Sequence, residues 1–161
     1  MADDSTLNLR ISNLLTPVTI GLHLRGTERD QVLRELVELI PALRARASER
    51  ERLLRALIER EIMHSTGIGD GLALPHTRNT LGGLVDHPLI AMGRHPTGIS
   101  FAAIDGKPVR LFFLLLSTSV PEHLYLLART SRLLRNPTLR EGLLTAPRPE
   151  TVMTLLRQAE S

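Results

Sequence analysis

A chain of 161 residues, 42% hydrophobic and 23% charged, has the composition of one ordinary globular domain. The absence of cysteine excludes disulfides, thiolate metal sites and cysteine nucleophiles. The longest strongly apolar run, residues 111–116, is far shorter than the ~20 residues of a membrane span, and the polar, acidic N-terminus does not resemble a secretory signal. We therefore expect a single cytoplasmic domain over residues 1–161, with its core at roughly 9–156 and no membrane insertion.

The charge pattern argues against a nucleic-acid partner. The net charge is +3, and the arginines alternate with glutamates, as in residues 49–52, which is typical of solvated helix faces. A surface that binds nucleic acid would combine a basic stripe with aromatic residues for stacking, and this chain has three Phe and one Tyr.

The N-terminal part of the chain predicts one strand and two helices. Aliphatic residues alternate over residues 18–24, as in a strand. Apolar residues then recur at helical spacing between Thr27, a predicted N-cap, and Pro41, which ends the helix. A second helix, capped by Ser48, should end near His64 because turn-forming residues follow.

The C-terminal part predicts strands followed by helices. Short strands are expected at residues 72–74 and 89–92, and Asp105-Gly106 predicts a hairpin turn between residues 99–103 and 109–117. The second arm of this hairpin is apolar on both faces, as expected for a central strand covered on both sides. Helices should follow after Pro121 and at residues 137–145 and 149–159; in the first of them the residues at helical spacing are Leu124, Leu127, Ala128, Ser131 and Leu134. This mixture predicts a single-domain α/β sandwich whose mixed parallel and antiparallel sheet has helices on both faces.

Candidate chemistry concentrates in residues 60–78. This stretch combines an arginine at a helix end, the hydroxyl pair Ser65 and Thr66, three glycines in five positions, and Pro75-His76 after a short strand. A glycine-rich turn can direct several backbone N–H groups towards an anion. Proline fixes its own φ and ends regular sheet pairing. A histidine held at a strand end beside such a turn suits a phosphoryl acceptor.

The chemistry of imidazole supports this interpretation. A neutral ring is nucleophilic at one nitrogen while the other carries a proton, and a hydrogen bond from that N–H to a carbonyl would select the tautomer. The phosphorylated ring carries a dianionic group, so cationic and hydroxyl donors are needed nearby. The candidate donors are Arg60, His123, Ser65 and Thr66.

Other chemistries lack their sequence patterns. No Gly-Lys-Ser/Thr follows the glycines, no two histidines lie four residues apart, and no Gly-x-Ser-x-Gly elbow occurs. We therefore expect no metal and no organic cofactor. A zinc cluster of His64, His76 and His123, as in a metal hydrolase, stays open as an alternative.

The stretch that ends in Pro75-His76 is similar to the active-site signature of the fructose/mannitol-type enzyme IIA domains of the bacterial phosphoenolpyruvate-dependent sugar phosphotransferase system. The order Arg-Glu, then Ser-Thr-Gly-Ile-Gly, then Ala-Leu-Pro-His most resembles the nitrogen-regulatory branch. The resemblance to this family also includes residues 101–106 and 121–124, so it covers most of the chain. The residues that carry the signature are Arg60, Glu61, Ser65, Thr66, Gly67, Ile68, Gly69, Leu72, Ala73, Leu74, Pro75 and His76.

The resemblance implies a role for three residues. It makes His76 the phosphorylated histidine, His123 the second active-site histidine, and Arg60 the arginine that supports the phosphoryl group. It also implies a single mixed sheet flanked by helices. Thr77 departs from the family pattern, which usually has a very small residue at this position, and its effect on donor docking is open.

The resemblance also implies partners. The phosphoryl donor would be an HPr-type phosphohistidine protein that docks on an apolar patch around His76. If the chain is complete, without a IIB or membrane domain, a regulatory role is favoured, in which phosphorylation changes the protein that is bound. The alternatives are a stand-alone transport IIA that passes phosphate to a sugar-specific IIB, and a protein-binding module that is not phosphorylated.

Overall fold

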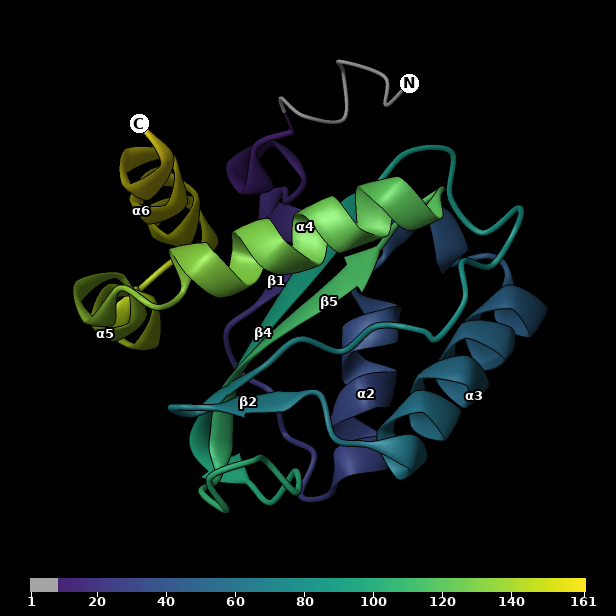
Figure 1. Ribbon diagram of the computed structural model, residues 1–161, viewed down its shortest axis with the longest axis horizontal. Helices are drawn as coiled ribbons and strands as arrows, with labels where there is room; N and C mark the ends of the chain where they lie inside the picture. The colour runs from purple at the N-terminus through teal and green to yellow at the C-terminus, as the bar shows by residue number, and fades with distance from the viewer. Residues whose placement is uncertain (1–8) are drawn as a thin grey trace.

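The computed structural model describes residues 9–161, and its centre is a mixed five-stranded sheet (Figure 1). In chain order the strands are β1 (Ile20–Gly21), β2 (Gly67–Gly69), β3 (Leu72–Ala73), β4 (Leu89–Ile99) and β5 (Val109–Leu116). Their order in the sheet is β1-β4-β5-β3-β2. Strand β5 pairs antiparallel with β4 and parallel with β3, so the predicted mixed sheet is confirmed. The predicted domain also includes residues 1–8, which lie outside the described residues.

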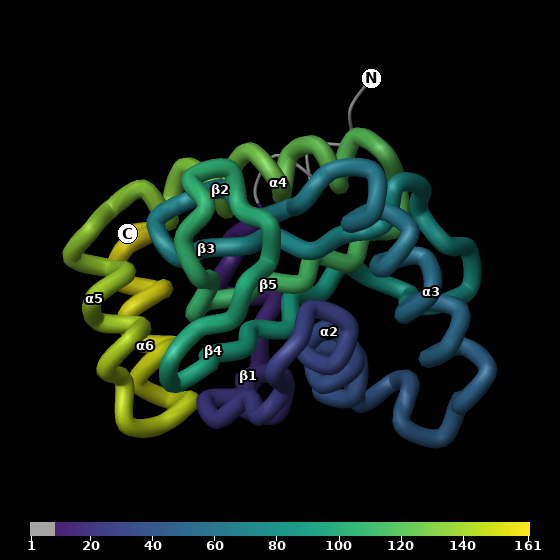
Figure 2. The backbone as a smooth tube through the Cα atoms, turned by 90° about the horizontal axis from the view of Figure 1, so that it is seen from below, coloured from purple at the N-terminus to yellow at the C-terminus, as the bar shows by residue number. Residues whose placement is uncertain are grey.

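Helices cover both faces of this sheet. They are α2 (Arg29–Glu38), α3 (Ala47–Met63), α4 (Val120–Leu133), α5 (Pro137–Thr145) and α6 (Pro149–Glu160), with short 3₁₀ turns at Ile11–Asn13, Pro17–Thr19 and Pro41–Leu43. Helices α2 and α3 contribute to the core on one face, and α4, α5 and α6 contribute to the core on the other (Figure 2). The predicted α/β sandwich is therefore the observed fold.

The central strand β5 explains the two-sided core. Phe112 and Leu114 point into the core of α2 and α3, whereas Leu111 and Phe113 point into the core of α4 to α6. All four side chains are at most 1% exposed. Because successive residues of a strand face opposite sides, a strand buried on both faces must be apolar at every position.

Helix α2 packs closely on the sheet at Gly93, a β4 residue paired with Phe112. A Cβ at this position would lie 2.6 Å from Cδ1 of Leu24 and 2.7 Å from Cδ2 of Leu36. Both leucines are buried. The close approach of the helix therefore requires glycine at this position.

Several local predictions in the N-terminal half are wrong. The alternation over residues 18–24 gives only the two-residue strand β1, because Pro17 begins a 3₁₀ turn that includes Val18. Glu28 is the N-cap of α2, while the N–H of Thr27 donates to the side chain of Gln31. Helix α3 begins before Ser48, which therefore lies inside its first turn and does not cap it.

Two predictions in the C-terminal half also differ from the structure. Residues 100–103 form a loop and not a strand, and β5 pairs instead with a β4 that runs on to Ile99. In α4 the buried residues are Leu126 and Thr130, whereas Leu124 is 59% exposed. Leu127 packs against the core and Leu134 is fully buried, as their spacing predicted, whereas Leu124 departs from the pattern and lies beside the candidate site.

Candidate functional site

His76 lies just beyond β3, in a backbone held on both sides by hydrogen bonds. The N–H of Leu74 donates to the carbonyl of Thr66 (3.0 Å), and the N–H of Leu115 in β5 donates to the carbonyl of Pro75 (3.0 Å). The Nδ1 atom of His76 lies 2.7 Å from the carbonyl oxygen of Leu74. Because a carbonyl oxygen only accepts, Nδ1 carries the proton and the lone pair is on Nε2. The predicted selection of one tautomer by a carbonyl is therefore present.

The imidazole of His76 is held in its neutral form. Burial lowers the pKa of His76 from 6.5 to about 4, with smaller contributions in the same direction from His123 and Arg60. The hydrogen bond to Leu74 acts in the opposite direction and offsets part of this shift. At neutral pH the ring is therefore a neutral nucleophile, although its side chain is only 9% exposed.

His123 reaches the same place from the first turn of α4. Ser119 caps this helix by accepting a hydrogen bond from the N–H of Glu122 (3.3 Å), and Pro121 favours its first turn. The ring centroids of His76 and His123 lie 4.9 Å apart, with a tilt of 47° between the rings. Burial, followed by the charge of Arg60, lowers the pKa of His123. The site thus pairs two imidazoles whose neutral forms are favoured.

Two arginines supply positive charge. Arg60, in the last turn of α3, lines the cavity and donates from Nη1 to the carbonyl of His64 (2.5 Å). Arg78 also lines the cavity, and within residues 9–161 it makes no hydrogen bond or ion pair. Arg78 was not among the donors predicted from the sequence, although its position two residues after His76 was an available signal.

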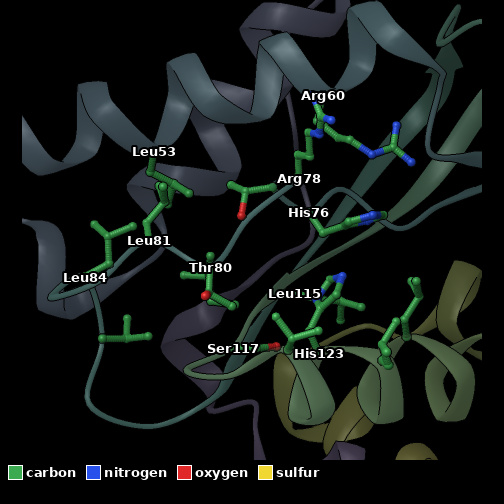
Figure 3. A pocket seen from close by; sticks show the side chains of 16 residues that line it. Leu53, Arg60, His76, Arg78, Thr80, Leu81, Leu84, Leu115, Ser117 and His123 are labelled. Atoms are coloured by element: carbon green, nitrogen blue, oxygen red, sulfur yellow. The ribbon is translucent and has the colours of Figure 1, made fainter.

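These residues surround a cavity of about 290 Å³ between α3, α4 and the loop that follows His76. Figure 3 shows Arg60 and Arg78 on one side of His76, with His123 and Ser117 on the other. The hydroxyl of Ser117 is buried and has no hydrogen-bond partner within the described residues. Apolar side chains line the rest of the cavity, including those of Leu53, Leu81, Leu84, Leu115, Val120, Leu124 and Leu127.

Ser65 and Thr66 do not line this cavity. The Ser65 hydroxyl donates to the carbonyl of Phe101 (2.6 Å) and accepts from the N–H of Gly67 (3.0 Å). The Thr66 hydroxyl donates to the carboxylate of Glu61. Both hydroxyls therefore hold the turn between α3 and β2, in contrast to the expectation that they support a phosphoryl group directly. The Thr77 hydroxyl is likewise engaged, with the carbonyl of Asn79 (2.5 Å).

The alternative of a zinc site does not match the geometry. Over residues 9–161, no three His, Cys, Asp or Glu side chains come together in a group that could hold a metal ion. His64, the third member of the hypothetical cluster, is exposed at the end of α3. His76 and His123 therefore form a pair without a third ligand of these types in the described residues.

The mixed sheet with helices on both faces matches the fold of one class of protein. A family model described as "Phosphoenolpyruvate-dependent sugar phosphotransferase system, EIIA 2" matches residues 13–159. The chain belongs to this family. Within residues 9–161, no helix is both long and apolar enough to cross a membrane.

Relatives of the chain are named either as nitrogen regulatory proteins or as fructose-specific components of the phosphotransferase system. The chain is 31% identical over 150 residues to the nitrogen regulatory protein of Pseudomonas aeruginosa, covering 92% of this chain and 95% of that protein. It is 32% identical over 152 residues to the fructose-specific EIIABC component of Bacillus subtilis, covering 93% of this chain but 23% of that protein. It also spans 65% of the fructose-specific EIIA component of Haloferax volcanii, with 36% identity over 103 residues and coverage of 63% of this chain.

Solved structures agree with the fold. The nitrogen regulatory protein IIA-Ntr of Neisseria meningitidis superposes with a TM-score of 0.79 at 30% identity, covering 91% of this chain and 98% of that one. The mannitol IIA of Escherichia coli superposes with a TM-score of 0.72 at 20% identity, covering 88% of this chain and 98% of that one, and so shows the same fold.

Proposed function

We propose that this protein is a phosphohistidine carrier, in which Nε2 of His76 accepts a phosphoryl group from an HPr-type phosphohistidine protein. The observation that supports this most directly is the hydrogen bond between Nδ1 of His76 and the carbonyl of Leu74. It leaves Nε2 as the free nucleophilic nitrogen of a ring whose pKa is lowered to about 4. A cytoplasmic location is part of the same proposal.

The proposed step is a displacement between two imidazoles. The lone pair of Nε2 forms a bond to phosphorus while the bond between phosphorus and the donor imidazole breaks, and its electron pair stays on the donor nitrogen. His76 keeps its Nδ1 proton, so its ring becomes formally cationic, and the carbonyl of Leu74 stabilises this N–H. Positioning and charge stabilisation suffice for this transfer, so the proposal requires no metal or organic cofactor.

The surroundings of His76 suit the dianionic product. Arg60, Arg78 and His123 line the same cavity and can direct N–H groups towards the phosphoryl oxygens. Arg78 has no competing partner within the described residues, so it is free to turn towards the new charge. Ser65 and Thr66 would contribute indirectly, by holding the turn that leads to His76.

We further propose that the role is mainly regulatory. Phosphorylation would add about two negative charges beside Val120 and Leu124, which line the cavity and are each 59% exposed. An apolar surface that gains such a charge would bind a different set of protein partners. The similarity to the nitrogen regulatory protein of Pseudomonas aeruginosa, of which the chain covers 95%, supports this role.

A transport role is the second candidate. The fructose-specific EIIABC relative favours it, since there a region like this chain occurs in a transport component. In that case the phosphoryl group on His76 would pass to a IIB domain. Incubation of the phosphorylated protein with candidate IIB domains separates the two roles, because only the transport role predicts rapid loss of phosphate from His76.

The carrier proposal is tested by phosphorylation with a phosphorylated HPr-type donor, followed by mapping of the modified residue. Wild-type protein should gain one acid-labile phosphate on His76, and His76→Ala should gain none while it remains folded. His64→Ala is the matched control, because His64 is exposed and does not line the cavity. Undiminished uptake by His76→Ala would show that another residue is the acceptor. No uptake by wild-type protein would favour the alternative of a binding module that is not phosphorylated.

A further inference from the structure

Glu61, near the end of α3, is a buried acid without an ion pair. Its side chain is 5% exposed, and burial raises the pKa of its carboxyl group. Within residues 9–161, no Arg, Lys or His forms a salt bridge with it. Both of its oxygens are instead used by Thr66: Oε2 accepts from the Thr66 N–H (2.9 Å), and Oε1 accepts from the Thr66 hydroxyl. Because burying a carboxyl group is costly, these contacts need a structural or functional reason.

The contacts of Glu61 continue to the candidate acceptor. Thr66, which Glu61 holds, accepts a hydrogen bond at its carbonyl from the N–H of Leu74 (3.0 Å). Leu74 in turn accepts at its own carbonyl from Nδ1 of His76 (2.7 Å). Three consecutive residue-to-residue contacts therefore lead from a buried carboxylate to the imidazole. The N–H and the carbonyl of Leu74 belong to different peptide units, so these hydrogen bonds do not form one continuous network. The contacts therefore fix the positions of the residues along the backbone.

Glu61 is also the neighbour of Arg60 in the helix. Arg60 lines the cavity and contributes to the lowered pKa of both histidines. One carboxylate therefore joins the end of α3, which carries the cation, to the turn and strand that lead to His76. Loss of the hydrogen bonds between Glu61 and Thr66 would therefore change the position of Arg60 relative to His76.

We infer that Glu61 is a positioning residue for phosphoryl transfer, which holds the Leu74 carbonyl in place for Nδ1 of His76 and so keeps Nε2 free beside Arg60 and His123. This inference rests on the proposed function of His76. It also gives Thr66 a defined role, since Thr66 is the only link between Glu61 and Leu74 in the contacts just described. A misplacement of about 1 Å at a transfer site can lower a rate by about a hundredfold.

The test compares Glu61→Gln, Glu61→Ala, Thr66→Val and Thr66→Ser with wild-type protein. The first readout is the kcat and KM of phosphate uptake from a phosphorylated HPr-type donor. We expect Glu61→Ala and Thr66→Val to lower kcat by about tenfold to a hundredfold, with KM within about twofold of wild type. Thr66→Ser, which restores the hydroxyl, should recover most of the rate lost in Thr66→Val.

The second readout is the tautomer of His76, measured by ¹⁵N NMR of the unphosphorylated protein. The wild-type ring should be the Nδ1–H form, and Glu61→Ala should increase the Nε2–H form or broaden the ring signals. This measurement needs no donor protein. A wild type that takes up no phosphate would thus refute the carrier function, whereas the tautomer of the variants tests the positioning by Glu61 separately.

Glu160→Gln is the control for the loss of a buried, hydrogen-bonded carboxylate; unlike Glu61, Glu160 also forms an ion pair, with Arg129 (3.2 Å). The Glu160 side chain is 2% exposed and accepts from the N–H groups of Ile11 (2.8 Å) and Ser12 (2.7 Å), and neither these residues nor Glu160 lines the cavity. We expect it to leave kcat and the His76 tautomer unchanged. The inference is overturned if folded Glu61→Gln and Glu61→Ala proteins keep wild-type kcat and tautomer, or if Glu160→Gln causes the same changes. If Glu61→Ala does not fold, Glu61→Gln and Thr66→Val decide in its place.

Discussion

The depressed pKa of His76 should make the stability of the protein depend on pH. Burial lowers this pKa from 6.5 to about 4, so in the folded protein the ring stays neutral over a range where the unfolded chain takes up a proton. Because the unfolded state binds more protons in this range, the free energy of unfolding falls as the pH falls from about 6.5 to about 4. At roughly 1.4 kcal/mol per pH unit, the whole range corresponds to roughly 3 kcal/mol.

Urea unfolding of wild-type protein and His76→Gln, at about pH 7 and about pH 4.5, measures this contribution. Wild type should lose roughly 2 kcal/mol more than His76→Gln between the two pH values, since the substituted side chain does not titrate. His64→Gln leaves His76 in place, so it should keep the wild-type difference. An NMR titration of the His76 ring should give a midpoint near 4.

Two results would refute this reasoning. A midpoint near 6.5 for His76 would mean that burial does not disfavour the charged ring in the folded protein. Equal losses of stability in wild type and His76→Gln would mean that other groups cause the acid sensitivity. Either result would also weaken the argument that a neutral Nε2 is available for phosphoryl transfer.

Three further predictions concern the cavity and the core. His123→Ala should slow phosphate uptake from a phosphorylated HPr-type donor by roughly tenfold to a hundredfold without abolishing it, because Arg60 and Arg78 still line the cavity. Uptake at the wild-type rate would exclude a role for His123. Arg78→Ala should shorten the lifetime of phosphorylated His76 and slow its formation, whereas a phosphoprotein of unchanged lifetime and rate of formation would show that Arg78 points elsewhere. Gly93→Ala should lower the free energy of unfolding by about 1–3 kcal/mol, because the new Cβ meets Leu24 and Leu36. Gly82→Ala is the control, because Gly82 has open space around it. Equal stability of the two variants would contradict the packing argument.

Strands and helices could be predicted from the sequence where the local pattern of apolar residues or prolines favours the same structure as the tertiary packing. The all-apolar run in β5 predicted a central strand, because only a strand covered on both faces has no polar side. The helices after residue 136 and after residue 148 each begin at a proline, as expected from the fixed φ of that residue. Thr27 and Ser48 were wrong as N-caps because the actual helix starts, at Arg29 and Ala47, differ from those the capping patterns predicted.

The position of His76 just beyond a short strand was predicted from the sequence, although β3 ends at Ala73, one residue earlier than predicted, and the carbonyl of Pro75 still accepts a hydrogen bond from β5. The tautomer of His76 and the residues that surround it could not be predicted from the sequence. Several features of the site depend on how α3, α4 and β3 pack together. They are the approach of His123 and Arg78 to His76, the hydrogen bonds of Ser65 and Thr66 inside the turn, and the burial of Glu61. Periodicity and turn residues act over a few positions and so determine local structure, whereas the hydrogen-bond partner of a side chain is decided by residues that only the folded chain brings within about 3 Å.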